Sequence, residues 1–263
     1  MKPDPATGEN AGLGSKTAAP GIFLEGLCFA YPGGAPVVET FDLALDAERW
    51  TALLGPSGCG KSTLLRLISG SLPCSGGTLR FEPSAGVSFP CAWMAQKDLL
   101  LPWLTAEQNV LLGYRLRGEV NEGLRGKASK LLKAAGLERW GRSLPAALSG
   151  GMRQRVALLR TLMEERSLIL MDEPFSALDA LTRLRLQDLA AAMVSEATVI
   201  LVTHDPLEAL RLAHRILVLD GTPVRVREVL DPPGRPPRSV DRPEVAALHA
   251  RLLQRLIPGD GRP

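Results

Sequence analysis

The chain has 263 residues, of which 45% are hydrophobic and 22% charged, and its formal net charge is +3. This length fits one large domain or one domain with a small appendage, and the composition is typical of a globular protein with an ample core. The small net charge gives no reason to expect a nucleic-acid partner. No apolar stretch approaches the roughly 18 residues that a membrane-spanning helix needs.

Two further signals concern the cell compartment. The N-terminus lacks the charged, apolar and small-residue order of a signal peptide, so we expect a cytoplasmic protein. The four cysteines show no C-x-x-C pair and no clustering with the three histidines. This pattern indicates unpaired thiols in a reducing compartment.

The first part of the chain predicts a leader and two strands. Residues 1–20 are small, polar and rich in Gly, Pro and Ala, as in a disordered segment. Apolar residues then recur at strand-like spacing over residues 22–31, and the alternation resumes over residues 37–45 after a Pro-Gly-Gly turn. We expect these two strands to form an antiparallel edge sheet.

A glycine-rich segment matches the phosphate-binding pattern G-x-x-x-x-G-K-S/T at every fixed position. Its residues are Gly55, Pro56, Ser57, Gly58, Cys59, Gly60, Lys61 and Ser62. A buried strand is predicted before it, at residues 50–54, and a helix after it that begins at Thr63, with its positive end and Thr63 facing the phosphates. In such a loop backbone N–H groups surround a nucleoside triphosphate, Lys61 reaches the β/γ oxygens and Ser62 ligates Mg²⁺. A chance glycine-rich turn, the alternative, does not explain these flanks.

The middle of the chain predicts a helical block inserted into an α/β domain, over about residues 97–165. Thr105 and Gln108 form a capping-box pattern that opens its first helix. Short strands before the block and further helices within it are expected at residues 78–81, 91–94, 128–137 and 150–165.

After this block the α/β pattern resumes. Strands and helices alternate at residues 168–171, 180–194, 198–203, 206–213 and 216–219. Asp205 and Glu208 form another capping-box pattern, with Pro206 at the favoured first helical position. Alternation of this kind is typical of an α/β fold.

Two adjacent acids follow the apolar strand at residues 168–171. Asp172 at its tip would hold Mg²⁺ opposite Ser62, and Glu173 is placed to polarise an attacking water as a general base. A surface acidic pair is the plainer alternative. Its place after the phosphate loop, in the second half of an α/β domain, favours the catalytic role.

A second anion site is predicted at Ser149, Gly150 and Gly151. Ser149 is a good N-cap, and the two glycines expose backbone N–H groups at a helix start. One chain does not easily bring this site to its own phosphate loop. We therefore expect it to close over the γ-phosphate held by another copy.

The last forty or so residues predict a tail that ends in a packing helix. Residues 221–263 are rich in Arg and Pro as far as Arg242, and apolar residues then recur at helical spacing. The Arg cluster could contact anionic lipid or nucleic acid, but we interpret it as a solvated basic linker.

These motifs together resemble the ATP-binding-cassette (ABC) ATPase family, whose signature L-S-G-G-x-x-Q matches residues 148–154. The resemblance covers about residues 22–220, with the motifs in the family's order. It implies an α/β fold in which a P-loop NTPase core carries an antiparallel β edge sheet and an inserted α-helical subdomain.

The resemblance also implies roles for single residues. Tyr31 matches the aromatic that stacks on adenine, although a tyrosine at a strand end is also an ordinary feature. Gln96 matches the glutamine that senses Mg²⁺ and water and links to the membrane subunit, and His204 matches the histidine that contacts the γ-phosphate. Residues 176–179 match the D-loop, which crosses the dimer interface and ends in Asp179. The signature residues that would meet the ATP of a second subunit are Ser149, Gly150, Gly151 and Gln154.

The resemblance further implies partners. A homodimer would enclose two ATP molecules with Mg²⁺, and an integral membrane permease on a separate chain would place the protein at the inner face of the membrane. Residues 96–104, 150–155 and 175–183 are similar to the bacterial nitrate/sulfonate/taurine importer group, which also works with a solute-binding protein. Residues 220–223 and the tail are instead similar to the branch that imports thiamine-precursor pyrimidines, so the solute stays open.

Two other functions would use the same chemistry. An exporter or lipoprotein-release ATPase would share every motif and differ in its membrane partner. A cassette protein acting on DNA or the ribosome is disfavoured, because those usually carry paired cassettes or a long coiled-coil insertion. Residues 99–101 and Trp103 could line a groove for a helix of the permease, or simply pack within the helical block.

Overall fold

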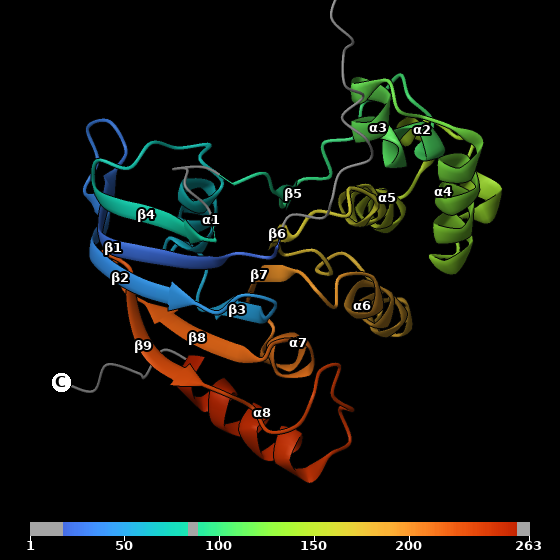
Figure 1. The fold of residues 1–263 in the computed structure, drawn as a ribbon. Coiled ribbons are helices and arrows are strands. Elements are labelled where there is room, and N and C mark those ends of the chain that lie inside the picture. Colours follow the sequence, from blue (N-terminus) through green and yellow to red (C-terminus); the bar gives the residue numbers. More distant parts are fainter. Residues whose placement is uncertain (1–17, 84–88, 257–263) are drawn as a thin grey trace, which may run out of the picture.

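The computed structural model describes residues 18–83 and 89–256, whose strands form two sheets. A three-stranded sheet has the order β2-β1-β4, and a six-stranded sheet has the order β5-β6-β7-β3-β8-β9 (Figure 1). The strands are β1 (Gly21–Ala30), β2 (Pro36–Leu45), β3 (Trp50–Leu54), β4 (Gly76–Glu82), β5 (Ala92–Met94), β6 (Leu168–Asp172), β7 (Thr198–Thr203), β8 (Arg215–Asp220) and β9 (Arg225–Leu230).

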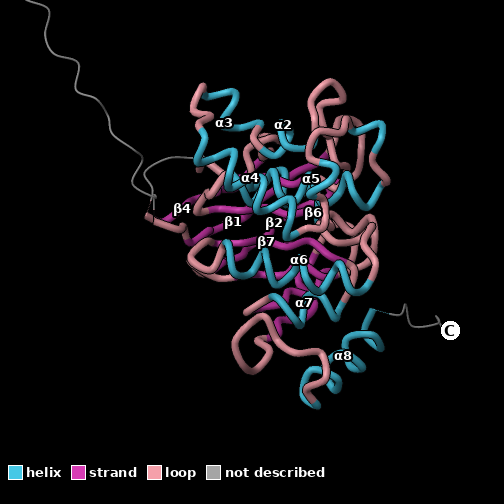
Figure 2. The backbone as a smooth tube through the Cα atoms, turned by 90° about the vertical axis from the view of Figure 1, so that its right-hand side faces the viewer, coloured by secondary structure: helices cyan, strands magenta, loops and turns pink. Residues whose placement is uncertain are grey.

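The helices lie on both faces of the six-stranded sheet. They are α1 (Lys61–Ile68), α2 (Ala106–Val110), α3 (Leu112–Arg117), α4 (Glu122–Ala134), α5 (Gly150–Met163), α6 (Ala180–Met193), α7 (Pro206–Leu212) and α8 (Pro243–Leu256), with 3₁₀ turns at Glu138–Trp140 and Pro145–Ala147. Helices α5, α6 and α7 cover one face, and α1 lies on the other, between the two sheets (Figures 1 and 2). Among the described residues, no helix has the length and apolar character to cross a membrane.

The centre of the six-stranded sheet is parallel and buried. Strands β3, β6 and β7 have no exposed residue, as expected for parallel strands covered on both faces by other elements. The register pairs Leu54 with Thr203 and Asp172 with Val202, so the carboxyl ends of these strands meet at one edge. That edge carries the phosphate loop, Asp172 at the end of β6 and Glu173 directly after it.

The three-stranded sheet is antiparallel and packs over α1. Ile22 and Phe81 of this sheet share one hydrophobic core with Leu64 and Leu65 of α1 and with Ile200 of β7. The sequence predicts this edge sheet from β1 and β2, and the structure adds β4 as its third strand.

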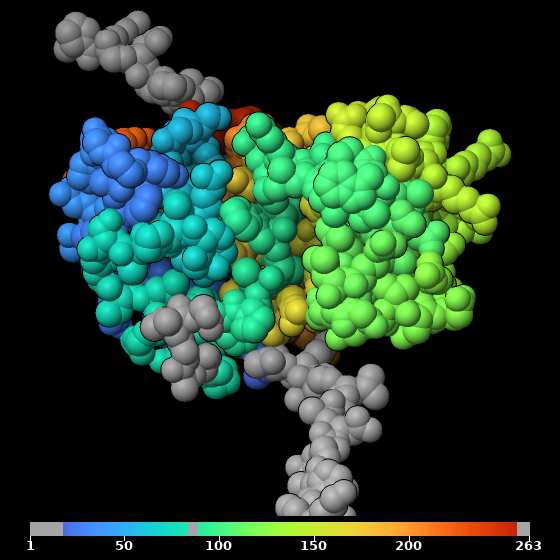
Figure 3. Space-filling model, turned by 90° about the horizontal axis from the view of Figure 1, so that it is seen from above, coloured from blue at the N-terminus to red at the C-terminus, as the bar shows by residue number. Residues whose placement is uncertain are grey.

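The helical block stands as a separate lobe beside the sheets, green in Figure 3. Thr105 caps α2 with the reciprocal Gln108 bond that the sequence predicts. The helix predicted at residues 128–137 is wrong in its bounds, because Asn121 caps its start and the left-handed Gly136 (φ 69°) follows its end.

The segment after β8 differs most from expectation. Strand β9 pairs antiparallel with β8, within residues that the sequence analysis treats as tail. Arg238, interpreted as part of a solvated linker, is only 2% exposed. Helix α8 lies where the apolar spacing predicts a helix, and its Val245 and Leu252 share a core with α7.

The structure also differs from two smaller sequence-based expectations, at Pro20 and at Asp205. Pro20, placed in the predicted leader, is buried and its carbonyl accepts a 2.7 Å bond from the Thr198 hydroxyl, whereas residues 1–17 lie outside the described residues. Asp205 caps α7 through its side chain, but its own N–H donates to the Thr203 hydroxyl rather than to Glu208. The capping box predicted at Asp205 and Glu208 is therefore only half formed.

Candidate functional site

The phosphate loop has a backbone that requires glycine at three positions. Gly58 and Gly60 adopt left-handed φ angles of 84° and 102°. At Gly55 the obstacle is space, because a Cβ there would lie 2.4 Å from the carbonyl oxygen of Leu219. The chain thus turns tightly between β3 and α1, whose eight residues begin at Lys61.

Lys61 is buried within this loop. Its side chain is folded back so that Nζ donates to the carbonyls of Gly55 at 2.8 Å and Pro56 at 2.7 Å. The Cys59 thiol, also buried, lies 3.9 Å from the same nitrogen. An ammonium has three donors, so this arrangement concentrates positive charge inside the loop that the sequence predicts to bind phosphate.

Ser62 and Asp172 meet across the gap between α1 and β6. The Ser62 hydroxyl donates to the Asp172 carboxylate, whose pKa is raised mainly by burial and lowered in part by this bond and by Lys61. Asp172 is 6% exposed. A hydroxyl and a carboxylate oxygen at one point form the hard-oxygen donor set that Mg²⁺ prefers.

Glu173 and His204 form a pair at the tips of the neighbouring strands β6 and β7. Glu173 Oε1 lies 2.9 Å from His204 Nδ1, and the Glu173 N–H donates to Val202 O. Glu173 has a positive φ of 50°, which is uncommon for a side chain of its size and typical of strained functional positions. The carboxylate is mostly buried, whereas the imidazole is 57% exposed.

The signature segment begins α5 in the helical block. Ser149 caps this helix by accepting from the Met152 N–H, and it is exposed together with Gly150. Gly151 is needed for space, since a Cβ there would lie 3.0 Å from Ala177 O.

Gln154, by contrast, is buried in its own chain. Its amide donates to the carbonyls of Glu173 at 3.2 Å and Pro174 at 3.3 Å. The structure thus ties the signature helix to the loop that carries Glu173, an arrangement that the sequence analysis did not predict.

Tyr31 and Asp179 lie at the margins of the site. The Tyr31 hydroxyl is 3.2 Å from Thr63 Oγ1 on α1, and its ring, 39% exposed, stands edge-on to Phe29. Asp179 caps α6 through a bond from the Thr182 N–H, which lowers its pKa. Tyr31 is therefore next to the phosphate loop, and Asp179 is exposed at the end of the D-loop.

Gln96 follows β5 and is exposed at the same sheet edge as Asp172, because β5 pairs with β6 up to Met94. The residues after it are tied to α5. Arg160 donates to the carbonyls of Asp98 at 2.7 Å and Leu99 at 2.8 Å. Sequence reasoning missed this connection, since an arginine in a helix gives no signal of its long-range partner.

A buried asparagine holds the same segment. The Asn109 side chain bonds to the main chain of Leu101, Leu104 and Thr105, and no part of it is exposed.

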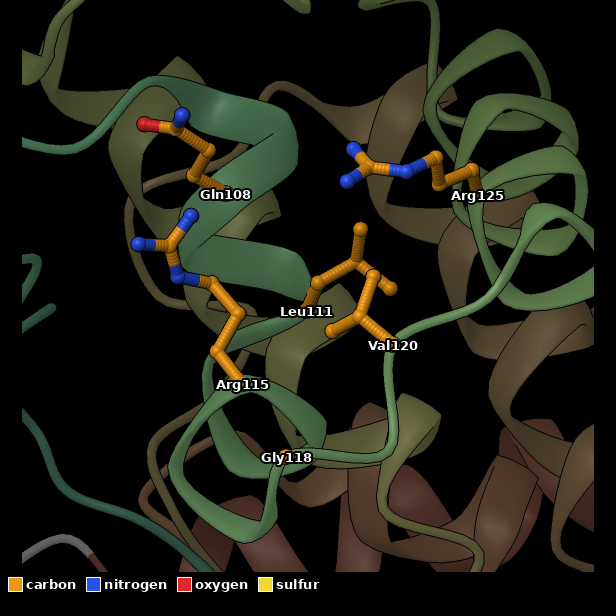
Figure 4. Close-up of a pocket in the computed structure, with 6 residues that line it drawn as sticks. All are labelled: Gln108, Leu111, Arg115, Gly118, Val120 and Arg125. Atoms are coloured by element: carbon orange, nitrogen blue, oxygen red, sulfur yellow. The ribbon is translucent and has the colours of Figure 1, made fainter.

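A separate pocket of about 240 Å³ lies in the helical block, where Arg115 and Arg125 flank Leu111 and Val120 (Figure 4). It contains none of the residues that the sequence predicts to bind nucleotide.

The comparisons with known proteins agree with this geometry. The family model described as "ABC transporter" matches residues 38–176, from β2 through the phosphate loop to the D-loop. The chain belongs to the ABC transporter family. It is an ATPase of that family, and the family match includes residues 55–62.

Relatives of this ABC ATPase extend over most of its length. It is 40% identical to the aliphatic sulfonates import ATP-binding protein SsuB 1 of Rhizobium johnstonii, over 96% of this chain and 92% of the relative. It is 42% identical to SsuB of Escherichia coli, over 84% and 85%, and 43% identical to an uncharacterized ABC transporter ATP-binding protein of Haemophilus influenzae, over 89% and 98%.

Among solved structures, an ATP-binding cassette in a dimeric post-hydrolysis state with ADP and phosphate matches with a TM-score of 0.73. It is 29% identical to this chain and covers 81% of it and 100% of the solved chain. The P-loop NTPase core with an inserted helical block, as the resemblance implies, is therefore confirmed.

Proposed function

We propose that this ABC ATPase is the energy-coupling subunit of a bacterial importer, which dimerises on ATP and drives a separate membrane permease. The relatives named as import ATP-binding proteins, at about the same length as this chain, support this assignment. An exporter would use the same nucleotide chemistry, so the permease and a solute-binding protein are what separate the two.

The contact between Glu173 and His204 is the observation that supports the catalytic part of this proposal. Glu173 is held by a 2.9 Å contact to an imidazole and by its main-chain bond to β7, beside the Ser62–Asp172 pair. We assign Glu173 as the general base that takes a proton from the attacking water, with His204 orienting its carboxylate. The exposed imidazole of His204 would also contact the γ-phosphate.

The residues present fit Mg²⁺. Ser62 and Asp172 supply a hydroxyl and a carboxylate oxygen that contact each other, and Gln96 lies two residues after the adjacent strand β5. When bound, the ion would neutralise phosphate charge and orient the β/γ oxygens. Lys61 supplies the remaining positive charge and can exchange its two loop carbonyls for phosphate oxygens.

The second half of each site would come from another copy. Ser149 and Gly150 are exposed at the start of α5, and the related cassette was solved as a dimer. Their backbone N–H groups and the helix end suit a γ-phosphate that the partner subunit holds. Gln154 then acts by holding the Glu173 loop, and Asp179 by shaping the dimer face.

The surface for the permease is proposed at Leu99 and Trp103, which are 61% and 70% exposed just after Gln96. Exposed apolar side chains at such a junction suit a helix of a membrane partner. The protein would then be cytoplasmic and peripheral at the inner face of the membrane. For the solute, the SsuB relatives favour an aliphatic sulfonate over a pyrimidine.

The function is tested with Glu173→Gln. We expect phosphate release from ATP to fall by about 10²- to 10⁴-fold, because the general base is lost, while equilibrium binding of ATP is kept. The control is Glu138→Gln, an exposed carboxylate in the helical block, which should turn over ATP as the wild type does. Unchanged phosphate release in Glu173→Gln would remove Glu173 as the base.

A further inference from the structure

A single arginine joins the D-loop to the turn that carries His204. Arg183 lies on α6, one turn after the D-loop. Its Nη2 donates to Leu178 O at 3.2 Å, and its Nη1 donates to Asp205 Oδ2 at 3.0 Å. One planar guanidinium therefore bridges two segments that come from different parts of the chain.

Asp205 passes this link to the neighbouring histidine. Its Oδ1 accepts from the N–H groups of Leu207 at 2.9 Å and Glu208 at 3.4 Å, and its own N–H donates to Thr203 Oγ1. Both sides of the turn are thus fixed, and His204 lies between Thr203 and Asp205. Because His204 is joined to Asp205 through the main chain, a shift of Asp205 would turn the imidazole that contacts Glu173.

Glu208 lies beneath the same turn and is 4% exposed. Burial, and then the charge of Asp205, raise its pKa to about 8, against opposing effects of Thr203 and Arg183 and with a small contribution from Glu173. At neutral pH it is therefore mostly uncharged. Asp205 is then the carboxylate charge that meets Arg183.

The cluster of Arg183, Asp205 and Glu208 still contains polar atoms without hydrogen-bond partners. Three buried side-chain polar atoms have no hydrogen-bond partner in the described part of the chain, and two of them, Arg183 Nε and Glu208 Oε1, belong to this cluster. Both residues line a cavity of about 140 Å³ between α6 and α7, whose other walls are mainly apolar. Buried polar atoms are rarely left unpaired, and functional sites under strain are one setting where they occur.

We propose that Arg183 is a positioning residue that transmits the position of the D-loop, at the dimer face, to the His204–Glu173 pair. The inference rests on the proposed function, because it needs Glu173 as the base and the D-loop at an interface between two copies. Arg183 itself touches no reacting atom. Its contribution is to let the base reach its working geometry only when the D-loop is engaged.

The test compares Arg183→Met with Arg185→Met in the full chain. Arg185 is an exposed arginine on the same helix and serves as the matched control. For Arg183→Met we expect kcat for ATP hydrolysis to fall by about 10- to 100-fold, because a small misplacement of a catalytic group has an effect of this size. The KM for ATP should stay within about twofold and Arg185→Met should match the wild type.

A second variant keeps the proposal testable if Arg183→Met folds poorly. Asp205→Asn preserves an N-cap but removes the charge that Arg183 meets. It should lower kcat as Arg183→Met does, and the double variant should be no slower than either single variant. Arg183→Lys should recover only part of the rate, since an ammonium cannot bridge both acceptors as a fork does.

Wild-type kcat in Arg183→Met, additive losses in the double variant, or a loss of rate that follows a loss of ATP affinity would each overturn the proposal. If Glu173→Gln lowers turnover while Arg183→Met does not, the proposed function stands and this inference alone is wrong. If Glu173→Gln has no effect either, the proposed function is the part that failed.

Discussion

Lys61 and Arg238 are both buried cations held by main-chain carbonyls, yet the two sites have opposite characters. Lys61 is 6% exposed and donates to two carbonyls of its own glycine-rich loop. Arg238 is 2% exposed and bonds to five carbonyls, two at the end of α7 and three in the segment after β9. All five donors of its guanidinium are used.

The difference shows how a buried charge can serve binding or structure. The third donor of Lys61 meets only the weak sulfur acceptor of Cys59 at 3.9 Å, so a phosphate oxygen can replace its present partners. Arg238 is saturated, and it supplies the free carbonyls of Leu210 and Ala213 with donors that the helix end lacks. Its substitution should therefore change stability and leave ATP binding unaffected.

The largest expected change in stability comes from Arg238→Met. The variant keeps an apolar side chain of similar length but leaves five carbonyls without their donor, so the free energy of unfolding should fall by about 3 kcal/mol or more. Arg235→Met, an exposed neighbour in the same segment, is the control and should lose almost nothing. Urea unfolding measures both, and a loss below about 0.5 kcal/mol in Arg238→Met would contradict the comparison.

A more gradual effect is expected from Glu208→Gln, and it depends on pH. The Glu208 pKa rises from 4.5 to about 8 on folding, so between these values the folded chain holds a proton that the unfolded chain has lost. Wild-type stability thus decreases across this window as the pH rises, and the decrease ends above about pH 8. The variant lacks this effect, so its stability relative to the wild type should grow by up to about 1.4 kcal/mol per pH unit.

Unfolding curves of the two proteins across the same pH window measure this difference. A difference that stays constant with pH would show that Glu208 is charged in the folded chain rather than neutral beneath the turn before α7.

The smallest stability change is expected from Ser149→Ala. Loss of the α5 N-cap should lower the free energy of unfolding by about 1 kcal/mol, since one helical N–H loses its acceptor. Ser195→Ala, at an exposed turn, is the control. If Ser149 contacts the nucleotide of a second subunit, the rate of ATP hydrolysis should fall well beyond what this loss of stability explains. If the rate falls only in proportion to the loss of folded protein, Ser149 serves solely as the helix cap.

Much of the central sheet could be predicted because its strands are continuously apolar. The ranges expected for β3 and β7 agree with the structure residue for residue. Strand β9 was missed because exposed residues alternate with partly buried ones at this sheet edge, so the stretch lacks the apolar run of β3. Arg238 was misread for a related reason: a sequence does not show which arginine of a cluster finds carbonyls.

The candidate site followed from motifs where spacing reflects chemistry. Lys61, Ser62, Asp172, Glu173 and His204 were all predicted, and the structure brings the carboxyl ends of their strands to one edge. The contacts of Gln154 with the Glu173 loop and of Arg183 with Asp205 could not be predicted. They join residues 19 and 22 positions apart through folding of the whole domain.

The most direct measurement is the solution mass of Glu173→Gln with and without ATP and Mg²⁺. If the site is half of one completed by a second copy, the mass should double with ATP and return to that of one chain when Ser149→Arg is added, with ATP still bound. A mass of one chain in Glu173→Gln at full ATP occupancy would contradict the account.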